Sequence, residues 1–128
     1  MSDLLFSATE NCPGITFKAA EGTLLIAGES YSEEAAAALE KTIQHVRGHL
    51  DDRPEGTLSV TFALIYFNSS SARKIMTLMT TLDEAAEGGA DVRVAWHYRP
   101  GDESMAELGE DFGEDLEHAA FSLVEEDS

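Results

Sequence analysis

The sequence predicts an α/β protein with a mixed, mostly parallel sheet of about five strands and helices packed on it. One observation is the alternation of β-branched and aromatic runs with segments whose apolar residues recur every three or four positions, in the order ββαβαβαβ. A second is the spacing of these runs. Strands separated by helices pair in parallel through right-handed crossovers, whereas the first two strands are close enough to form an antiparallel hairpin.

The first predicted elements are that hairpin and a long helix. Residues 15–19 and 23–27 are short β-prone runs, and the Ala-Glu-Gly turn between them supplies a glycine that can take a positive φ. Ser30-Tyr-Ser-Glu33 has the spacing of a capping box, which predicts a helix from about Tyr31 to Leu50. The buried stripe of this helix is expected to consist of Ala35, Leu39, Ile43, Val46 and Leu50.

A central strand and a second helix follow a polar loop over residues 51–56, which contains Pro54. Both faces of Thr57–Phe67 are largely apolar, which predicts a strand that is covered on both sides or lies at a subunit contact. A helix is then expected from Ser70 to the glycine pair at 88–89. We interpret its apolar stripe as core rather than as a methionine-rich binding groove. The stripe consists of Ala72, Ile75, Met76, Met79, Leu82 and Ala86.

The last third of the chain predicts a strand, a helix and a final strand. Asp91–Tyr98 alternates between apolar and polar residues, as a strand does. Asp102 can cap the next helix, which is expected to be interrupted or bent near Gly109. Ala120–Val124 can close the sheet before an acidic tail that is expected to be frayed over about 125–128. The apolar side of the helix consists of Met105, Leu108, Phe112 and Leu116.

Composition limits what such a domain can bind. The chain has 128 residues and is 43% hydrophobic, which suits a single domain spanning residues 1–128. Its 25 acidic and 8 basic residues give a formal charge of −17, which disfavours binding to nucleic acid or to anionic membranes. The lone Cys12 cannot form an internal disulfide, and we find neither a secretory signal nor a membrane-spanning stretch. We therefore expect a cytoplasmic protein.

Four polar residues, Asn68 to Ser71, stand where the central strand ends and the second helix begins. Backbone N–H groups at a helix start have no partner within the helix, so this junction can hold an anion. We interpret Ser69 as a phosphate acceptor that can also serve as a cap, with Ser70 beside it and Arg73 one turn along. Capping alone explains the same residues, and from composition alone that alternative stays open.

Enzyme signatures are weak. The glycine-rich motifs of nucleotide sites are absent, and His45, His49, His97 and His118 fit no spaced ligand pattern with Cys12. The runner-up hypothesis is a carboxylate-based metal-binding or hydrolytic domain. A DNA-mimicking inhibitor is weaker because the acidic residues gather at one end of the chain. The carboxylates of the runner-up hypothesis are Glu110, Asp111, Glu114 and Asp115.

Five separated motifs cover most of the chain in order: Gly28-Glu-Ser-Tyr31, Tyr66-Phe-Asn-Ser-Ser-Ser71, Trp96-His-Tyr98, Asp102-Glu-Ser-Met105 and Gly109-Glu-Asp-Phe112. In this combination they resemble the SiaC family of bacterial regulatory phosphoproteins. This resemblance implies a fold like that of anti-sigma-factor antagonists, the STAS-like domains, with no catalytic residues and no cofactor. Tyr66, Phe67 and Phe112 lie in these motifs and are our candidates for partner contacts.

The resemblance also implies a partner switch in cyclic di-GMP signalling. In the family the acceptor hydroxyl follows Tyr-Phe-Asn, which places it at Ser69 here, although threonine is usual at that position. A cognate serine/threonine kinase phosphorylates the site and a PP2C-type phosphatase reverses the modification. The unmodified form binds and stimulates a diguanylate cyclase. Serine offers a kinase the same hydroxyl as threonine, so the switch is expected to survive this change.

Overall fold

The computed structural model describes residues 3–53 and 55–126, which form six strands and three helices. The strands lie in the sheet in chain order, β1-β2-β3-β4-β5-β6. The predicted class is confirmed, and the sheet has one strand more than expected. The elements are β1 (Leu4–Phe6), β2 (Gly14–Lys18), β3 (Thr23–Ser30), α1 (Glu33–Asp52), β4 (Thr57–Phe67), α2 (Ser69–Glu87), β5 (Asp91–Tyr98), α3 (Glu103–Glu114) and β6 (Ala120–Glu125).

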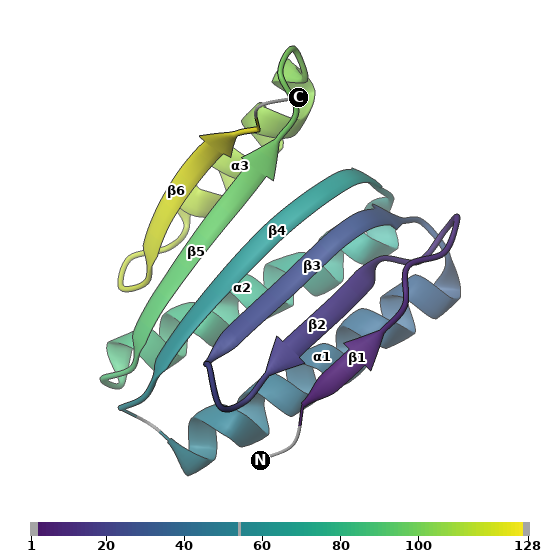
Figure 1. The fold of residues 1–128 in the computed structure, drawn as a ribbon. Helices are drawn as coiled ribbons and strands as arrows, with labels where there is room; N and C mark the ends of the chain where they lie inside the picture. The colour runs from purple at the N-terminus through teal and green to yellow at the C-terminus, as the bar shows by residue number, and fades with distance from the viewer. Residues whose placement is uncertain (1–2, 54, 127–128) are drawn as a thin grey trace.

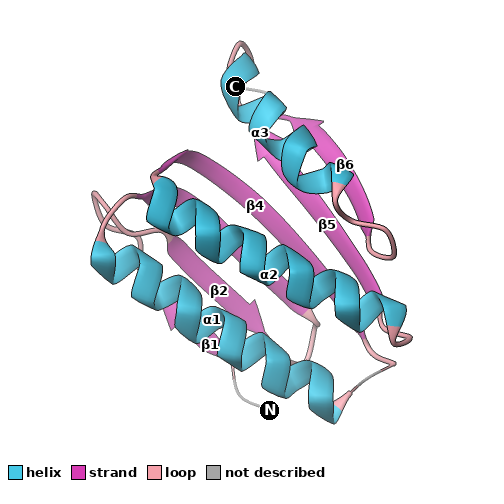
Figure 2. Cartoon of the chain, turned by 180° about the vertical axis from the view of Figure 1, so that it is seen from behind, coloured by secondary structure: helices cyan, strands magenta, loops and turns pink. Residues whose placement is uncertain are grey.

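All three helices cover the same face of the sheet (Figures 1 and 2). The pairs β1–β2 and β2–β3 are antiparallel, and every pair from β3 to β6 is parallel. Each crossover moves one strand further in the same direction. Right-handed connections that step in one direction place their helices on one side, so the sheet has a covered face and an open face.

The open face corrects the expectation that the central strand is covered on both sides. In β4 the covered face carries Leu58, Val60, Phe62 and Leu64, all buried. The side chains between them point to the open face, where Ile65 is 40% exposed. Strand residues alternate between faces, so one chain buries only one set. A subunit contact over the open face stays a prediction.

The additional strand is β1, which pairs with β2 through Leu4 opposite Phe17. The Asp3 side chain accepts a hydrogen bond from the Ala19 backbone N–H at 2.8 Å and fixes the start of this strand. Three residues are too few to show a period, so sequence reasoning missed β1.

The start of α1 also differs from the prediction. Strand β3 continues through Ser30, with an irregular register between Gly28 and Glu29. Ser32 is the cap, because its Oγ accepts a hydrogen bond from the Ala35 backbone N–H at 3.0 Å. The helix therefore begins at Glu33 and continues to Asp52, and the predicted loop residue Pro54 lies outside the described residues.

Helix α3 is unbroken at Gly109, contrary to the expected interruption. Asp102 caps the helix as predicted and accepts from the Met105 backbone N–H at 3.1 Å. Gly109 is buried against the Trp96 indole, whose Nε1 donates to the Met105 carbonyl at 3.1 Å. The glycine allows α3 to approach the sheet closely, which is a packing role rather than a helix break.

The end of the described chain is more ordered than the predicted frayed tail. Strand β6 includes Glu125, and the Glu126 backbone N–H donates to the Tyr98 carbonyl at 2.8 Å. Residues 127–128 of the predicted tail lie outside the described residues. In the described part of the chain, every helix is too short or too polar to cross a bilayer.

Candidate functional site

The predicted polar junction lies at the carboxyl end of β4, beside the carboxyl end of β3. Asn68 is the cap of α2, because its side-chain Oδ1 accepts from the Ser71 backbone N–H at 3.0 Å. The Asn68 backbone N–H in turn donates to the Ser30 carbonyl at 3.1 Å. Asn68 therefore does the capping, and Ser69 is the first residue of the helix.

The three serines have different environments. Ser69 and Ser70 are exposed, whereas Ser71 is fully buried. The Oγ atoms of Ser71 and Ser30 are 2.6 Å apart and share a hydrogen bond, and Ser30 is fully buried as well. This bond joins the end of β3 to the first turn of α2. Ser71 is therefore a structural residue, and Ser69 and Ser70 keep accessible hydroxyls.

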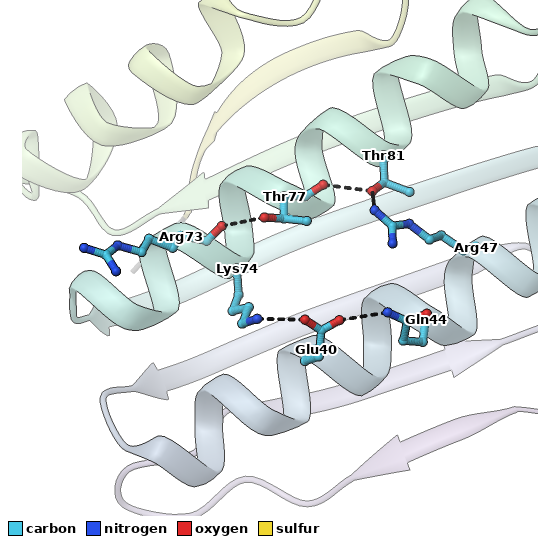
Figure 3. A network of polar contacts seen from close by, with 7 residues as sticks. All are labelled: Glu40, Gln44, Arg47, Arg73, Lys74, Thr77 and Thr81. Atoms are coloured by element: carbon cyan, nitrogen blue, oxygen red, sulfur yellow. Dashed lines mark hydrogen bonds and ion pairs between the residues drawn. The ribbon is translucent and has the colours of Figure 1, made fainter.

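The chain segment that carries these hydroxyls has no acidic residue. No Asp or Glu occurs between residues 56 and 82, although the chain has 25 of them, and the first turn of α2 has none. Lys74 pairs with Glu40 of α1 at 2.7 Å, and this hydrogen bond, followed by one from Gln44, lowers the pKa of the Glu40 carboxyl. Arg73 is exposed and points away from this network (Figure 3).

Exposed aromatic rings lie beside the junction. Tyr31 and Tyr66 are 41% and 53% exposed, and their ring centroids are 5.6 Å apart in an edge-to-face arrangement. Tyr66 was a predicted contact residue. Sequence reasoning missed Tyr31 as its neighbour, because only the pairing of β3 with β4 brings the two together.

The two other predicted contact residues pack inward. Phe112 is buried, and its ring lies 5.4 Å from that of Trp96. Phe67 is half-buried, 6.1 Å from the rings of both Trp96 and Phe112. These rings form a cluster that supports the end of β4, so Tyr66 offers the most accessible surface of the three.

The carboxylates of the runner-up hypothesis do not converge. Glu110, Asp111, Glu114 and Asp115 are exposed, and no group of three or more His, Cys, Asp or Glu side chains in residues 3–53 and 55–126 is placed to hold a metal ion. His49 is buried with its ring edge against Phe17, and burial, followed by the nearby Arg53, lowers the pKa of His49. A neutral core residue is the role that this environment supports.

An accessible hydroxyl at a helix start, beside exposed aromatic rings, is compatible with a regulatory protein-binding domain. Comparison with protein families gives the same result. Residues 6–126 match the model of the SiaC family regulatory phosphoproteins. The chain therefore belongs to the SiaC family, a family of regulators rather than of enzymes.

Individual relatives agree with this assignment. An uncharacterized protein of Pseudomonas aeruginosa strain UCBPP-PA14 is 37% identical over 117 residues, which cover 90% of each chain. The structure of SiaC of Pseudomonas aeruginosa aligns with a TM-score of 0.90 at 32% identity, over 98% of this chain and all of that one. SiaC in a crystal structure of the diguanylate cyclase SiaD with its activator SiaC also aligns at 0.90 and 32% identity, over 97% of this chain and 100% of that chain.

Proposed function

We propose that this protein is a phosphorylation-controlled partner switch in the cytoplasm. The unmodified form binds and stimulates a diguanylate cyclase, a cognate kinase releases it by phosphorylating Ser69, and a PP2C-type phosphatase restores it. The exposed position of Ser69 at the first residue of α2, in a helical turn without carboxylates, carries the proposal. The solved complex of the related SiaC with the cyclase SiaD supports the choice of partner.

The physical effect of the phosphate falls on docking rather than on folding. A phosphoserine adds about −1.5 to −2 charges at pH 7. The backbone N–H groups at the start of α2 favour an anion there, so the fold tolerates it. A partner carboxylate about 4 Å away would be repelled by about 4 kcal/mol per pair of unit charges at an effective dielectric near 20. With the charge of about −1.5 to −2, this repulsion amounts to about 6–8 kcal/mol. Changing 99% bound to 1% bound takes about 5.5 kcal/mol, so one phosphate is sufficient.

Ser69 is chosen over its neighbours for two reasons. The buried bond to Ser30 removes Ser71 from consideration. Ser70 is exposed as well, but Ser69 directly follows Tyr66-Phe-Asn68, the order that the family resemblance places before the acceptor. Ser70 therefore provides a matched control.

The test combines phosphosite mapping with binding to a diguanylate cyclase from the same organism. We expect Ser69→Glu to weaken binding at least tenfold, because it places a charge where the phosphate would be. Ser69→Ala is expected to bind normally and to resist release by the kinase. Ser70→Ala is expected to remain responsive. Mass spectrometry that finds the phosphate on Ser70, or equal binding by wild type, Ser69→Ala and Ser69→Glu, would contradict the proposal.

A further inference from the structure

The outer side of α2 presents one continuous surface that starts at the candidate phosphosite. We call this surface the α2 stripe. Its residues recur every three or four positions, all are exposed, and Arg73 is its one charged member. The stripe consists of Ser69, Ser70, Arg73, Met76, Thr77 and Thr80. In a chain with a formal charge of −17, a stripe with a positive residue and no carboxylate is a distinct surface.

The stripe is apolar beyond Arg73. Met76 is 54% exposed, although the sequence placed it in the core. The Thr77 hydroxyl donates to the Arg73 carbonyl at 3.0 Å, and the Thr80 hydroxyl donates to the Met76 carbonyl at 3.1 Å. Both hydroxyl protons are therefore used within the helix. What the middle of the stripe offers a partner is the methionine side chain and two methyl groups.

A cleft of about 100 Å³ between α2 and α3 adjoins the stripe at Met76 and Thr80. One apolar side chain of a partner would fit a cleft of this size. Its rim carries the carboxylates of Asp83, Glu84 and Asp115, and the Asp83 Oδ1 is engaged by three backbone N–H groups of the loop before β6. An acidic group of a partner is therefore favoured only at the Arg73 end of the stripe. The cleft is lined by Met76, Met79, Thr80, Asp83, Glu84, Phe112, Asp115 and Leu116.

We infer that the α2 stripe and this cleft form the docking surface for the diguanylate cyclase, and that the cyclase segment is apolar with a carboxylate opposite Arg73. The inference rests on the proposed function and adds the chemistry of the partner. The partner's carboxylate is inferred from charge complementarity to Arg73. The guanidinium makes no ion pair with any residue that the structure describes, so it is available to a carboxylate.

Arg73 also gives the phosphate a second way to weaken partner binding. Residues 69 and 73 are one helical turn apart, at the spacing where side chains on a helix surface meet. A phosphate on Ser69 therefore pairs with the Arg73 guanidinium. Phosphorylation then repels the partner's carboxylate and also removes the positive group that this carboxylate would bind.

The test uses the full chain, with matched variants, in binding to the same cyclase. We expect Arg73→Glu and Met76→Asp each to weaken binding by about tenfold or more. Arg73→Lys, which keeps the charge, is expected to retain most of the affinity. Lys41→Glu makes the same charge change at an exposed position on α1, and Leu5→Asp makes the same apolar-to-acidic change on β1. Both controls are expected to bind like wild type.

The outcomes separate this inference from the proposed function. Wild-type affinity in Arg73→Glu and Met76→Asp, with binding still lost in Ser69→Glu, overturns the docking surface and leaves the switch intact. Equal losses in the two control variants also overturn it, since total charge would then be the cause. If Met76→Asp instead dissociates a dimer of this protein in sedimentation velocity and leaves cyclase binding unchanged, the stripe contacts a second copy. A wild-type protein that binds no cyclase overturns both proposals.

Discussion

Replacing Gly109 by alanine is expected to destabilise the protein by about 2 kcal/mol, although alanine is the better helix former. Helix propensity alone would favour the change by about 1 kcal/mol. However, a Cβ at this position would lie 2.7 Å from both Cγ and Nε1 of Trp96, far inside ordinary contact distance. The indole is fully buried and hydrogen-bonded, so it has little room to move. Overpacking of this kind costs about 3 kcal/mol, which outweighs the gain in propensity.

The single tryptophan of the chain makes the assay direct. Urea or thermal unfolding followed by Trp96 fluorescence should show a melting temperature lower by about 6–12 °C for a domain of this size. Gly88→Ala is the matched control, since a Cβ there meets only carbonyl oxygens at 3.5 and 3.6 Å and the backbone is in the right-handed helical region. That variant should be as stable as wild type or slightly more stable. A Gly109→Ala protein that melts at or above the wild-type temperature would refute the packing argument.

Two further predictions concern polar contacts that fix the site and its surroundings. Ser71→Ala leaves the buried Ser30 hydroxyl without its partner and should cost about 1–3 kcal/mol. The double variant Ser30→Ala/Ser71→Ala should be less destabilised than the sum of the two single variants in chemical denaturation, and strict additivity would show that the hydroxyls do not interact. Asp83→Ala removes the acceptor of three backbone N–H groups and should cost about 1–2 kcal/mol at pH 7, since the site is partly exposed. Partial burial opposes ionisation of Asp83, but the N–H groups of the loop more than offset it and lower the pKa of this carboxyl, so its contribution is complete above about pH 4 and lost as the pH falls further. The wild-type and Asp83→Ala melting temperatures should therefore converge in acid, and a constant difference from pH 7 to pH 3 would contradict the assignment.

Elements with a strong local signal were predicted well, and those that depend on distant neighbours were not. Thr57–Phe67 and Asp91–Tyr98 match β4 and β5. The first is a long β-branched and aromatic run, and the second alternates over eight residues, so each signal is contained in the segment itself. Strand β1 exists because β2 provides a pairing edge, which no property of three residues reveals. Gly109 suggested a break because propensity describes an isolated helix, whereas the approach of Trp96 is a tertiary contact.

In the candidate site too, the local features were predictable from the sequence and the tertiary contacts were not. The hydroxyl-rich junction was predictable because capping chemistry is local. The difference between Ser69 and Ser71 was not, since it depends on Ser30, 41 positions before Ser71 in the chain. Met76 was assigned to the core because it falls in the repeat of apolar residues along the helix, but the neighbouring helix and the sheet select Ile75, Leu78, Met79 and Leu82 as the buried set. A shift of one residue on a helix turns a side chain by about 100° and is enough to expose it.

The contacts behind Ser69 determine whether its charge can act as a switch. A modified residue on a mobile loop could move its phosphate away from an approaching partner, which would weaken the effect on docking. Here the first turn of α2 is held from within by the Asn68 cap, by the Asn68 backbone bond to Ser30, and by the buried Ser30–Ser71 hydrogen bond. Rigid support of this kind fixes the position of the charge relative to Arg73 and to the α2 stripe. A fixed charge exerts its full repulsion on a docked partner, so under the proposed function a single modification would change the bound population while the fold stays the same.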